Sequence, residues 1–290
     1  MLKYIFKAMR PRQWTKNAFV LAALVFDRQL FHIQSLERTL LTFLIFCLVS
    51  SSVYLINDIM DIDADRLHPV KKNRPIASGK VPVSVAIVTS IVLILGSLVG
   101  SYFLSIGLLA IVAVYFVLNL AYSKWLKHVP IIDVLVIAAC FVLRVAAGVS
   151  VIQVERFSPW LYVVTTLFAL YIGFGKRRAE LMVLVPEHGQ SHRKVLSGYS
   201  IEFVDQLITI VSSTTIIAYS LYTFSAPNLP ANHAMMLTIP FVLYGIFRYL
   251  SIMQINKMGG EPEELLLKDH PLQITILLWA ISIMIIFYLF

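Results

Sequence analysis

Acidic residues gather in one short stretch of a very apolar chain. The segment NDIMDIDAD, residues 57–65, places four aspartates and one asparagine in nine positions. If the segment is helical, a rotation of about 100° per residue brings Asp58, Asp61 and Asp65 within about 60° of one another. Asp63 then points about 140° away from Asp58, on another face of the helix. Carboxylates that share a face repel one another and raise each other's pKa unless a cation lies between them. The spacing therefore predicts a cation site.

The surrounding residues indicate which cation this is and which ligand accompanies it. Oxygen ligands favour magnesium, manganese or calcium over zinc, and magnesium commonly binds a few carboxylates together with substrate phosphates. Phosphate-facing bases follow the acidic segment at once, namely Arg66, Lys71, Lys72 and Arg74. We therefore expect Mg²⁺, with Mn²⁺ as the alternative ion, beside a phosphate group. A solvated loop with incidental charges is the competing interpretation.

The rest of the chain must position this cluster in a membrane. It has 290 residues, of which 59% are hydrophobic, and a mean hydropathy of +0.81, which together predict a polytopic all-α membrane protein. Nine helices are expected from apolar runs long enough to span about 30 Å of hydrocarbon. The first run is the weakest, so eight helices plus a half-inserted segment is the alternative. The runs are 17–35, 38–56, 82–103, 106–122, 130–150, 159–175, 206–225, 234–252 and 271–290.

The basic residues predict the orientation of these helices. The amino terminus and the loops at about 57–81, 123–129, 175–205 and 253–270 carry 19 of the 24 Lys and Arg residues. The positive-inside rule places this side in the cytoplasm, with the amino terminus inside and the carboxyl terminus outside. Much of the net charge of +8 therefore reports topology and gives no argument for binding nucleic acid. The acidic cluster lies on the cytoplasmic side as well.

Two charged residues fall within one expected helix. Asp133 and Arg144 are eleven positions apart, which returns to nearly the same helix face about 16 Å further along the axis. An arginine near the middle of a membrane costs about 2.5–3.5 kcal/mol to insert. Arg144 should therefore face the bundle interior and bind an anion or a carbonyl group. Pairing with another helix purely to hold the bundle together is the other interpretation.

The acidic segment has a recognisable pattern. Asn57-Asp58-x-x-Asp61-x-x-x-Asp65, followed by Arg74-Pro75 and Ser78-Gly79, resembles the first aspartate-rich motif of the UbiA-type intramembrane prenyltransferase superfamily. The resemblance implies one domain over residues 1–290, with helices bundled around a central cavity open to the cytoplasm and to lipid. It also implies catalytic roles for Asp58 and Asp61, and Mg²⁺ ligands in Asn57, Asp58, Asp61 and Asp65.

The second motif of that superfamily is altered here. Its usual form is DxxxD in the loop after the sixth helix, where this chain has GFGKRRAEL at residues 173–181. Three consecutive bases and a single carboxylate replace the expected metal ligands. Added positive charge suits a substrate that carries more phosphate groups than a prenyl diphosphate.

Other segments resemble one branch of the superfamily, the decaprenyl-phosphate phosphoribosyltransferases. They are RPRQWTKN at 10–17, YSKWLK at 122–127 with Asp133, FVLRVAAG at 141–148, GKRRAEL at 175–181 and HRKVL at 192–196. The branch transfers 5-phosphoribose from phosphoribosyl diphosphate (PRPP) to a polyprenyl phosphate, with release of diphosphate. The product is the precursor of lipid-linked arabinose for cell-envelope synthesis.

Charge, helix position and resemblance together give the expected substrate-binding residues. These are Lys16, Asn17, Tyr54, Arg66, Lys72, Arg74, Tyr122, Lys124, Asp133, Arg144, Lys176, Arg177, Arg178 and Glu180. We expect an enzyme of the inner (plasma) membrane with a cytoplasmic active site; a homo-oligomer and a downstream epimerase are compatible with the resemblance. The alternatives are a prenyltransferase that joins a polyprenyl diphosphate to an aromatic or other acceptor, and a transporter or channel.

Overall fold

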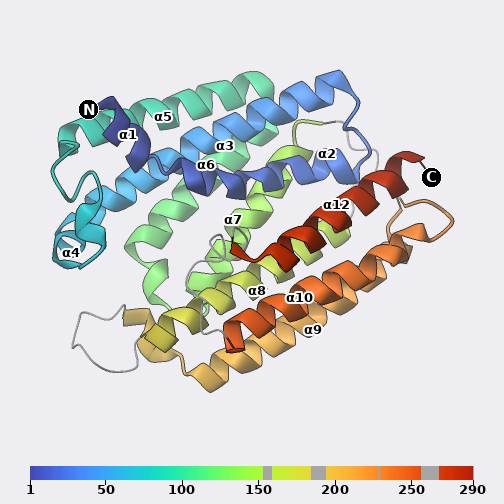
Figure 1. The fold of residues 1–290 in the computed structure, drawn as a ribbon. Coiled ribbons are helices and arrows are strands. Elements are labelled where there is room, and N and C mark those ends of the chain that lie inside the picture. The colour runs from blue at the N-terminus through green and yellow to red at the C-terminus, as the bar shows by residue number, and fades with distance from the viewer. Residues whose placement is uncertain (153–158, 184–193, 228, 256–267, 290) are drawn as a thin grey trace. The chain divides into compact units, whose positions relative to one another are not determined.

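A computed structural model describes residues 1–152, 159–183, 194–227, 229–255 and 268–289, and these residues form helices and turns without any β-strand (Figure 1). The expected all-α class is therefore confirmed. The α-helices are α1 (Leu2–Ala8), α2 (Ala22–Phe26), α3 (Ile33–Met60), α4 (Ile62–Leu67), α5 (Val83–Leu104), α6 (Ile106–Lys124), α7 (Ile132–Val149), α8 (Pro159–Val183), α9 (Ile201–Ser225), α10 (Ile239–Ile255) and α12 (His270–Leu289). Short 3₁₀ helices are η1 (Pro11–Leu21), η2 (Lys71–Asn73), η3 (Leu126–His128), η4 (Lys194–Gly198) and η5 (Ala234–Thr238).

Seven helical segments among the described residues are long and apolar enough to cross a membrane. They correspond to seven of the nine expected runs, and α8 covers an eighth, 159–175. The protein is thus a multi-pass membrane protein. The seven segments are Ile33–Met60, Val83–Leu104, Ile106–Lys124, Ile132–Val149, Ile201–Ser225, Ala234–Gln254 and His270–Leu289.

The prediction of one long α-helix over residues 17–35 is wrong. The chain there forms the 3₁₀ helix η1, then the short α2, and turns at Arg28, whose φ is 57°. Pro11 begins η1, and polar residues near its start compete for backbone hydrogen bonds, which disfavours a regular α-helix. A 3₁₀ helix rises about 2.0 Å per residue, so η1 still extends over about 22 Å.

Two expected loops are shorter than the hydropathy pattern predicts. Residues 57–60 belong to α3, and residues 175–183 belong to α8. The apolar pattern marks where the hydrocarbon ends, whereas a helix continues for as long as its backbone hydrogen bonds are made. Residues 184–193 and 256–267 of the expected loops, including His192 and Arg193 of the quoted motifs, lie outside the described residues.

The chain divides into two compact units. Unit 1 comprises Met1–Leu126 and Leu143–Val154, and unit 2 comprises Lys127–Val142 and Glu155–Phe290. Each unit has its own packing and its own group of buried charges. The expected single domain and its central cavity stay predictions.

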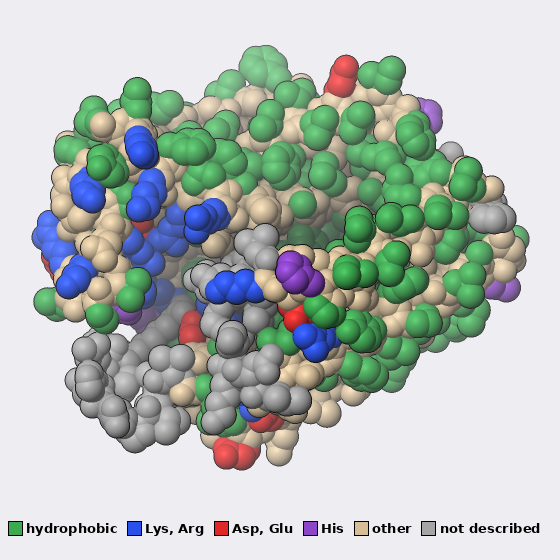
Figure 2. All heavy atoms as spheres, in the orientation of Figure 1, with side chains coloured by type: hydrophobic (Ala, Val, Ile, Leu, Met, Phe, Trp, Pro, Cys, Tyr) green, Lys and Arg blue, Asp and Glu red, His purple; other side chains and the backbone are tan. Residues whose placement is uncertain are grey.

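Helix α3 is the central element of unit 1, and it packs along α5 (Figure 1). Small polar residues make this contact close, because Ser52 Oγ lies 2.8 Å from Ser90 Oγ and both side chains are buried. Small residues of this kind let membrane helices approach and hydrogen-bond. Hydrophobic side chains cover the flanks of unit 1, whereas Lys and Arg gather at the end that carries α1 and α4 (Figure 2).

A glycine lets the irregular backbone of η1 approach α7 within unit 1. A Cβ atom at Gly148 would lie 2.0 Å from the carbonyl oxygen of Val20. Real Cβ atoms do not approach a backbone oxygen so closely, and a backbone cannot swing aside as a flexible side chain does. The close approach of η1 to this part of α7 therefore requires glycine.

Unit 2 is built on aromatic residues of α8, α9 and α10. The rings of Tyr171 and Tyr249 meet edge to face with centroids 5.3 Å apart, and Tyr171 donates a hydrogen bond to the Ile246 carbonyl at 2.8 Å. Trp279 of α12 donates to the Tyr219 hydroxyl at 2.8 Å. The buried hydroxyl groups of Tyr171 and Tyr219 thus each have a hydrogen-bond partner, as groups in an apolar interior require.

Replacing Gly148 by alanine should destabilise unit 1. The new methyl group overlaps the Val20 carbonyl, so we expect the free energy of unfolding in detergent to fall by about 1–3 kcal/mol. Gly96→Ala is the matched control, because a Cβ at Gly96 meets nothing within 4 Å and alanine favours a helix. Chemical unfolding followed by tryptophan fluorescence measures both. Equal stability of the two variants would contradict the close approach.

Candidate active site

Two aspartates from the 57–65 segment are buried together in unit 1. Asp58 lies in the last turn of α3 and Asp65 in α4, with relative exposures of 2% and 3%. Between them α3 ends at Met60, and the next residue, Asp61, has a φ of −96° and a ψ of 9°, which interrupt the helix. The prediction that Asp58, Asp61 and Asp65 share one face of a continuous helix is therefore wrong. The break reorients α4 and leaves a carboxylate pair instead of a triplet.

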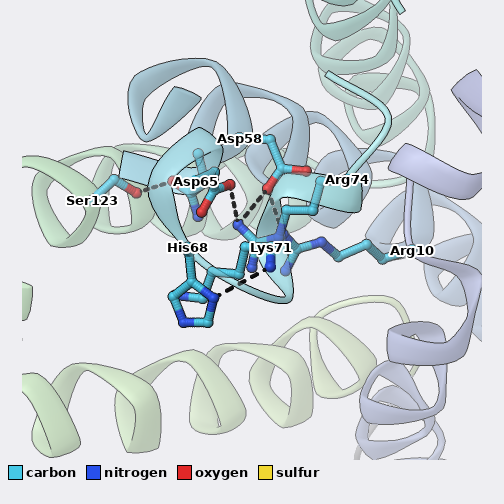
Figure 3. A network of polar contacts seen from close by, with 8 residues as sticks. Arg10, Asp58, Asp65, His68, Lys71, Arg74 and Ser123 are labelled. Atoms are coloured by element: carbon cyan, nitrogen blue, oxygen red, sulfur yellow. Dashed lines mark hydrogen bonds and ion pairs between the residues drawn. The ribbon is translucent and has the colours of Figure 1, made fainter. Parts of the chain in front are cut away.

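One guanidinium joins the two carboxylates (Figure 3). Arg74 Nη1 lies 2.5 Å from Asp65 Oδ2 and 3.2 Å from Asp58 Oδ1. Arg10 also donates a hydrogen bond to Asp58 Oδ1, and its guanidinium lies over the Tyr54 ring at 4.9 Å. Two aspartates and two arginines thus form a cluster in which positive and negative charges balance. The carboxylate oxygens converge on a single cationic nitrogen.

The loop that carries Arg74 is anchored by an apolar cluster. Ile76 and Val81 are buried against Leu55 of α3 and Ala86 of α5. The turn between them contains Gly79 at a φ of 74°, a conformation that favours glycine. Burial of Ile76, two residues after Arg74, fixes the backbone beside the carboxylates and leaves the long arginine side chain to reach them.

His68 shapes the start of the same loop. Its Nδ1 accepts hydrogen bonds from the backbone N–H groups of Val70 at 3.2 Å and Lys71 at 3.3 Å. Partial burial, reinforced by the Lys71 ammonium, lowers the pKa of the His68 imidazole. The neutral ring keeps a lone pair on Nδ1, which these hydrogen bonds need.

The remaining residues of the acidic motif are placed differently from the pair. Asn57 accepts a hydrogen bond from Ser123 of α6, and Asp61 is half-buried at the helix break. Asp63 is 91% exposed and lies 3.6 Å from Arg66. Among the residues that the structure describes, no three His, Cys, Asp or Glu side chains gather in a metal-binding group.

The predicted substrate residues of unit 1 are only partly brought together. Arg74 and Tyr54 lie at the carboxylate pair, whereas Arg66 lies beside exposed Asp63. Lys124 lies over the Trp125 ring at 4.6 Å. The exposed members of the set are Arg66, Lys72 and Lys124, and the half-buried members are Lys16, Tyr54, Arg74 and Tyr122.

Arg144 is held by neutral partners inside unit 1. Its Nε donates to Asn17 Oδ1 at 2.8 Å, and Nη2 donates to the Tyr115 hydroxyl at 2.8 Å. Asn17 in turn donates to Ser50 Oγ at 3.3 Å. Because both Arg144 and Asn17 are buried, these bonds tie η1, α3, α6 and α7 together. The arrangement supports the interpretation that Arg144 holds the bundle together.

A second group of charges is buried in unit 2. Arg177 Nε and Asp133 Oδ2 form an ion pair, with 2.7 Å between the two atoms, although the angle is not that of a hydrogen bond. The Arg177 and Asp133 side chains are 1% and 0% exposed. Arg177 also pairs with Glu180. Tyr199 donates to Asp133 Oδ1 at 2.7 Å and accepts from the Ile131 N–H at 2.6 Å. Burial and the hydrogen bond with Asp133 raise the pKa of the Tyr199 phenol, so it stays a donor.

The bases of the altered second motif therefore have partners within the protein. Arg178 Nε donates to Asp205 Oδ1 at 2.6 Å and Nη1 to the Met253 carbonyl at 3.0 Å. Arg177 is fully buried, and Lys176 is half-buried. Two of the three expected phosphate-binding charges are thus neutralised by carboxylates that lie far away in the sequence.

Sequence reasoning missed four partners in these networks: Arg10, Tyr115, Tyr199 and Asp205. Arg10 belongs to the quoted segment 10–17, and its position at the membrane boundary beside Pro11 is the one available signal. Nothing in the local sequence links Tyr199 or Asp205 to its partner, because the partners lie 66 and 27 positions away.

Comparisons with known proteins agree with this architecture. The sequence profile of the UbiA prenyltransferase family matches residues 18–258. The chain is 33% identical to a decaprenyl-phosphate phosphoribosyltransferase of Mycobacterium tuberculosis, over 96% of this chain and 92% of that protein. It is 36% identical to a protein of the same description from Mycolicibacterium smegmatis, over 95% and 89%. A UbiA homolog from Archaeoglobus fulgidus, bound to DMAPP and Mg²⁺, has the same fold with a TM-score of 0.73, 20% identity and 99% coverage of both chains.

Removal of the Arg177 charge should destabilise unit 2. Arg177→Gln leaves Asp133 buried without its cation, so the free energy of unfolding should fall by about 3–5 kcal/mol. Arg66→Gln is the matched control, since its partner Asp63 is exposed and stability should hardly change. The double variant Asp133→Asn, Arg177→Gln should recover part of the loss, because no buried charge remains. Unfolding in detergent measures all three, and a stable Arg177→Gln would contradict the structural role.

Proposed function

Because the chain belongs to the UbiA prenyltransferase family, we propose that it transfers 5-phosphoribose from PRPP to a polyprenyl phosphate, as a pentosyltransferase of the membrane. The products are polyprenylphosphoryl-5-phosphoribose and diphosphate. The observation that carries this proposal is the similarity to decaprenyl-phosphate phosphoribosyltransferases, which extends over nearly the whole chain. The altered second motif agrees with it, since an ordinary pair of aspartate-rich motifs is absent from the printed sequence.

The carboxylate pair supports the use of a divalent metal. Asp58 and Asp65 come from different helices, and their oxygens already converge on one cationic atom, Arg74 Nη1. A carboxylate set of this kind fits Mg²⁺, with Mn²⁺ as a substitute, so Asp58 and Asp65 would hold the ion, with Asp61 and Asn57 as further ligands. When bound, Mg²⁺ neutralises charge on the diphosphate leaving group.

The chain's own residues then act by binding and orientation. Arg10 and Arg74 contact the pair, and their guanidinium groups suit the bidentate binding of phosphate oxygens. The bond from ribose C1 to the diphosphate oxygen breaks, and a phosphate oxygen of the lipid forms the new bond to C1. That oxygen is already anionic at neutral pH, so the reaction needs no strong general base. Catalysis therefore rests on positioning and charge stabilisation.

The setting of the reaction follows from the charge distribution. Most basic residues lie on the side predicted to be cytoplasmic, which supports a carboxylate pair that faces the cytoplasm, within reach of a water-soluble phosphoribosyl donor. The acceptor enters from the bilayer. We assign the protein to the plasma membrane, where its product would serve cell-envelope synthesis through a downstream epimerase.

A paired assay separates this proposal from its alternative. Purified protein in detergent with Mg²⁺ receives polyprenyl phosphate plus PRPP in one reaction, and polyprenyl diphosphate plus 4-hydroxybenzoate in the other. We expect a metal-dependent lipid product heavier by one phosphoribosyl group in the first reaction alone, detected by mass spectrometry. Product in the second reaction alone would identify an aromatic prenyltransferase, and no product with either pair would favour a transporter.

Substitution of single aspartates tests the carboxylate pair. Asp58→Asn and Asp65→Asn should each lower the transfer rate by about a hundredfold or more, because a charge that stabilises the transition state is lost. Asp63→Asn should retain the rate within about threefold, since Asp63 is exposed and points away. Rates are measured with the same lipid assay, on variants whose fluorescence unfolding curves match the parent. An equal loss in all three would show that the pair has no special role.

A further inference from the structure

The carboxylates of the candidate site lie beneath the two guanidinium groups that neutralise them. Asp58 and Asp65 side chains are 2% and 4% exposed, whereas the Arg10 and Arg74 side chains are 29% and 27% exposed. We propose that Arg10 and Arg74 are placeholder cations, which occupy the metal-binding carboxylates until diphosphate arrives and then transfer to its oxygens. This inference rests on the proposed function, because it concerns the order in which that site is filled.

Because the charges of the cluster already balance, a metal ion should bind weakly to it in the absence of diphosphate. Two carboxylates and two guanidinium groups are already neutral together. A divalent cation that displaced the arginines would leave two guanidinium groups without their anions at a partly buried site, which carries a desolvation cost. A metal ion that arrives with diphosphate brings the anionic oxygens that the displaced guanidinium groups then bind.

The backbone is held in place at both arginines, so the Arg10 and Arg74 side chains can change partners while the backbone stays where it is. Arg74 follows η2 and precedes Ile76, which is 1% exposed. Arg10 has a left-handed φ of 55° between α1 and η1, an uncommon conformation for a residue other than glycine. Its guanidinium lies on the Tyr54 ring, so part of its stabilisation persists after Asp58 is released.

The thermodynamic consequence is strong positive coupling between metal and diphosphate. A metal ion or diphosphate that binds alone must break the contacts between the arginines and the aspartates. When both bind together, the aspartates contact the metal ion and the arginines contact the diphosphate, so every charge has a partner again. A coupling of about tenfold to a hundredfold in affinity is the usual size for linked sites. Removal of a placeholder arginine should tighten binding of the metal alone and weaken the coupling, whereas removal of a neighbouring charge should not.

The test measures Mn²⁺ binding to the full-length protein in detergent, by the electron paramagnetic resonance signal of free Mn²⁺, with and without inorganic diphosphate. The unmodified protein should bind Mn²⁺ about tenfold or more tightly when diphosphate is present. Arg74→Gln should bind Mn²⁺ alone about tenfold more tightly than the unmodified protein, with the diphosphate effect reduced to the same extent. Arg10→Gln should behave alike and serves if Arg74→Gln does not fold.

Lys80→Gln is the matched control, because it removes one positive charge from the loop that carries Arg74, and the Lys80 ammonium lies over the Tyr4 ring instead of at Asp58 or Asp65. Its Mn²⁺ affinity should stay within about threefold of the parent. Equal effects of Lys80→Gln and Arg74→Gln would overturn the proposal, and so would Mn²⁺ binding that is indifferent to diphosphate. If phosphoribosyl transfer is observed while either result holds, the proposed function stands and only the placeholder role is lost. Absence of both transfer and diphosphate-dependent Mn²⁺ binding overturns both.

Discussion

Neutralisation of buried charge is the constraint on which this structure depends. Asp58, Asp65 and Asp133 are almost completely buried, and a buried carboxylate without a counter-ion would be expelled or protonated. The chain meets the constraint in the same way in each unit, with an arginine brought from a different element. Arg74 and Arg10 serve the pair in unit 1, and Arg177 serves Asp133 in unit 2. These contacts join the loop after α4 to α3, and α8 to the start of α7.

The neutral polar residues solve a related problem within the membrane. Serines along α3 and α5 are buried, and Ser51 accepts a hydrogen bond from Trp14 at 3.0 Å while it donates to the Cys47 carbonyl at 2.7 Å. The Asn17 amide accepts a hydrogen bond from the long Arg144 side chain and so links the amino-terminal 3₁₀ helix to α7. Such contacts hold together helices that share apolar surfaces with lipid, where burial of apolar area gives little advantage. Polar stripes in a membrane helix therefore indicate packing as often as they indicate a substrate path.

Much of the fold follows from composition and periodicity, whereas the site follows only in part. Seven spans were predictable because a membrane helix requires a long apolar run. The aspartates near residue 58 were recognisable as a site because charged side chains at a membrane boundary are energetically unfavourable without a partner. The helix break at Asp61 was not predictable, since an aspartate tolerates both a helix and its end. The pairing of Asp58 with Arg10 joins residues 48 positions apart, and local spacing holds no information about such a distance. The same limit explains why the bases at 177 and 178 suggested phosphate binding before Asp133 and Asp205 were seen beside them.

The internal pairing of the aspartates also bears on how the protein is made. Many metal sites gain their order only when the ion is present, because their ligands repel one another in its absence. In this chain each buried carboxylate of the candidate site meets a guanidinium from the same polypeptide. Insertion into the bilayer and folding can therefore be completed before any ion or substrate has reached the site. The buried carboxylates are thus held in place by the polypeptide itself, and their order does not wait for a bound ion.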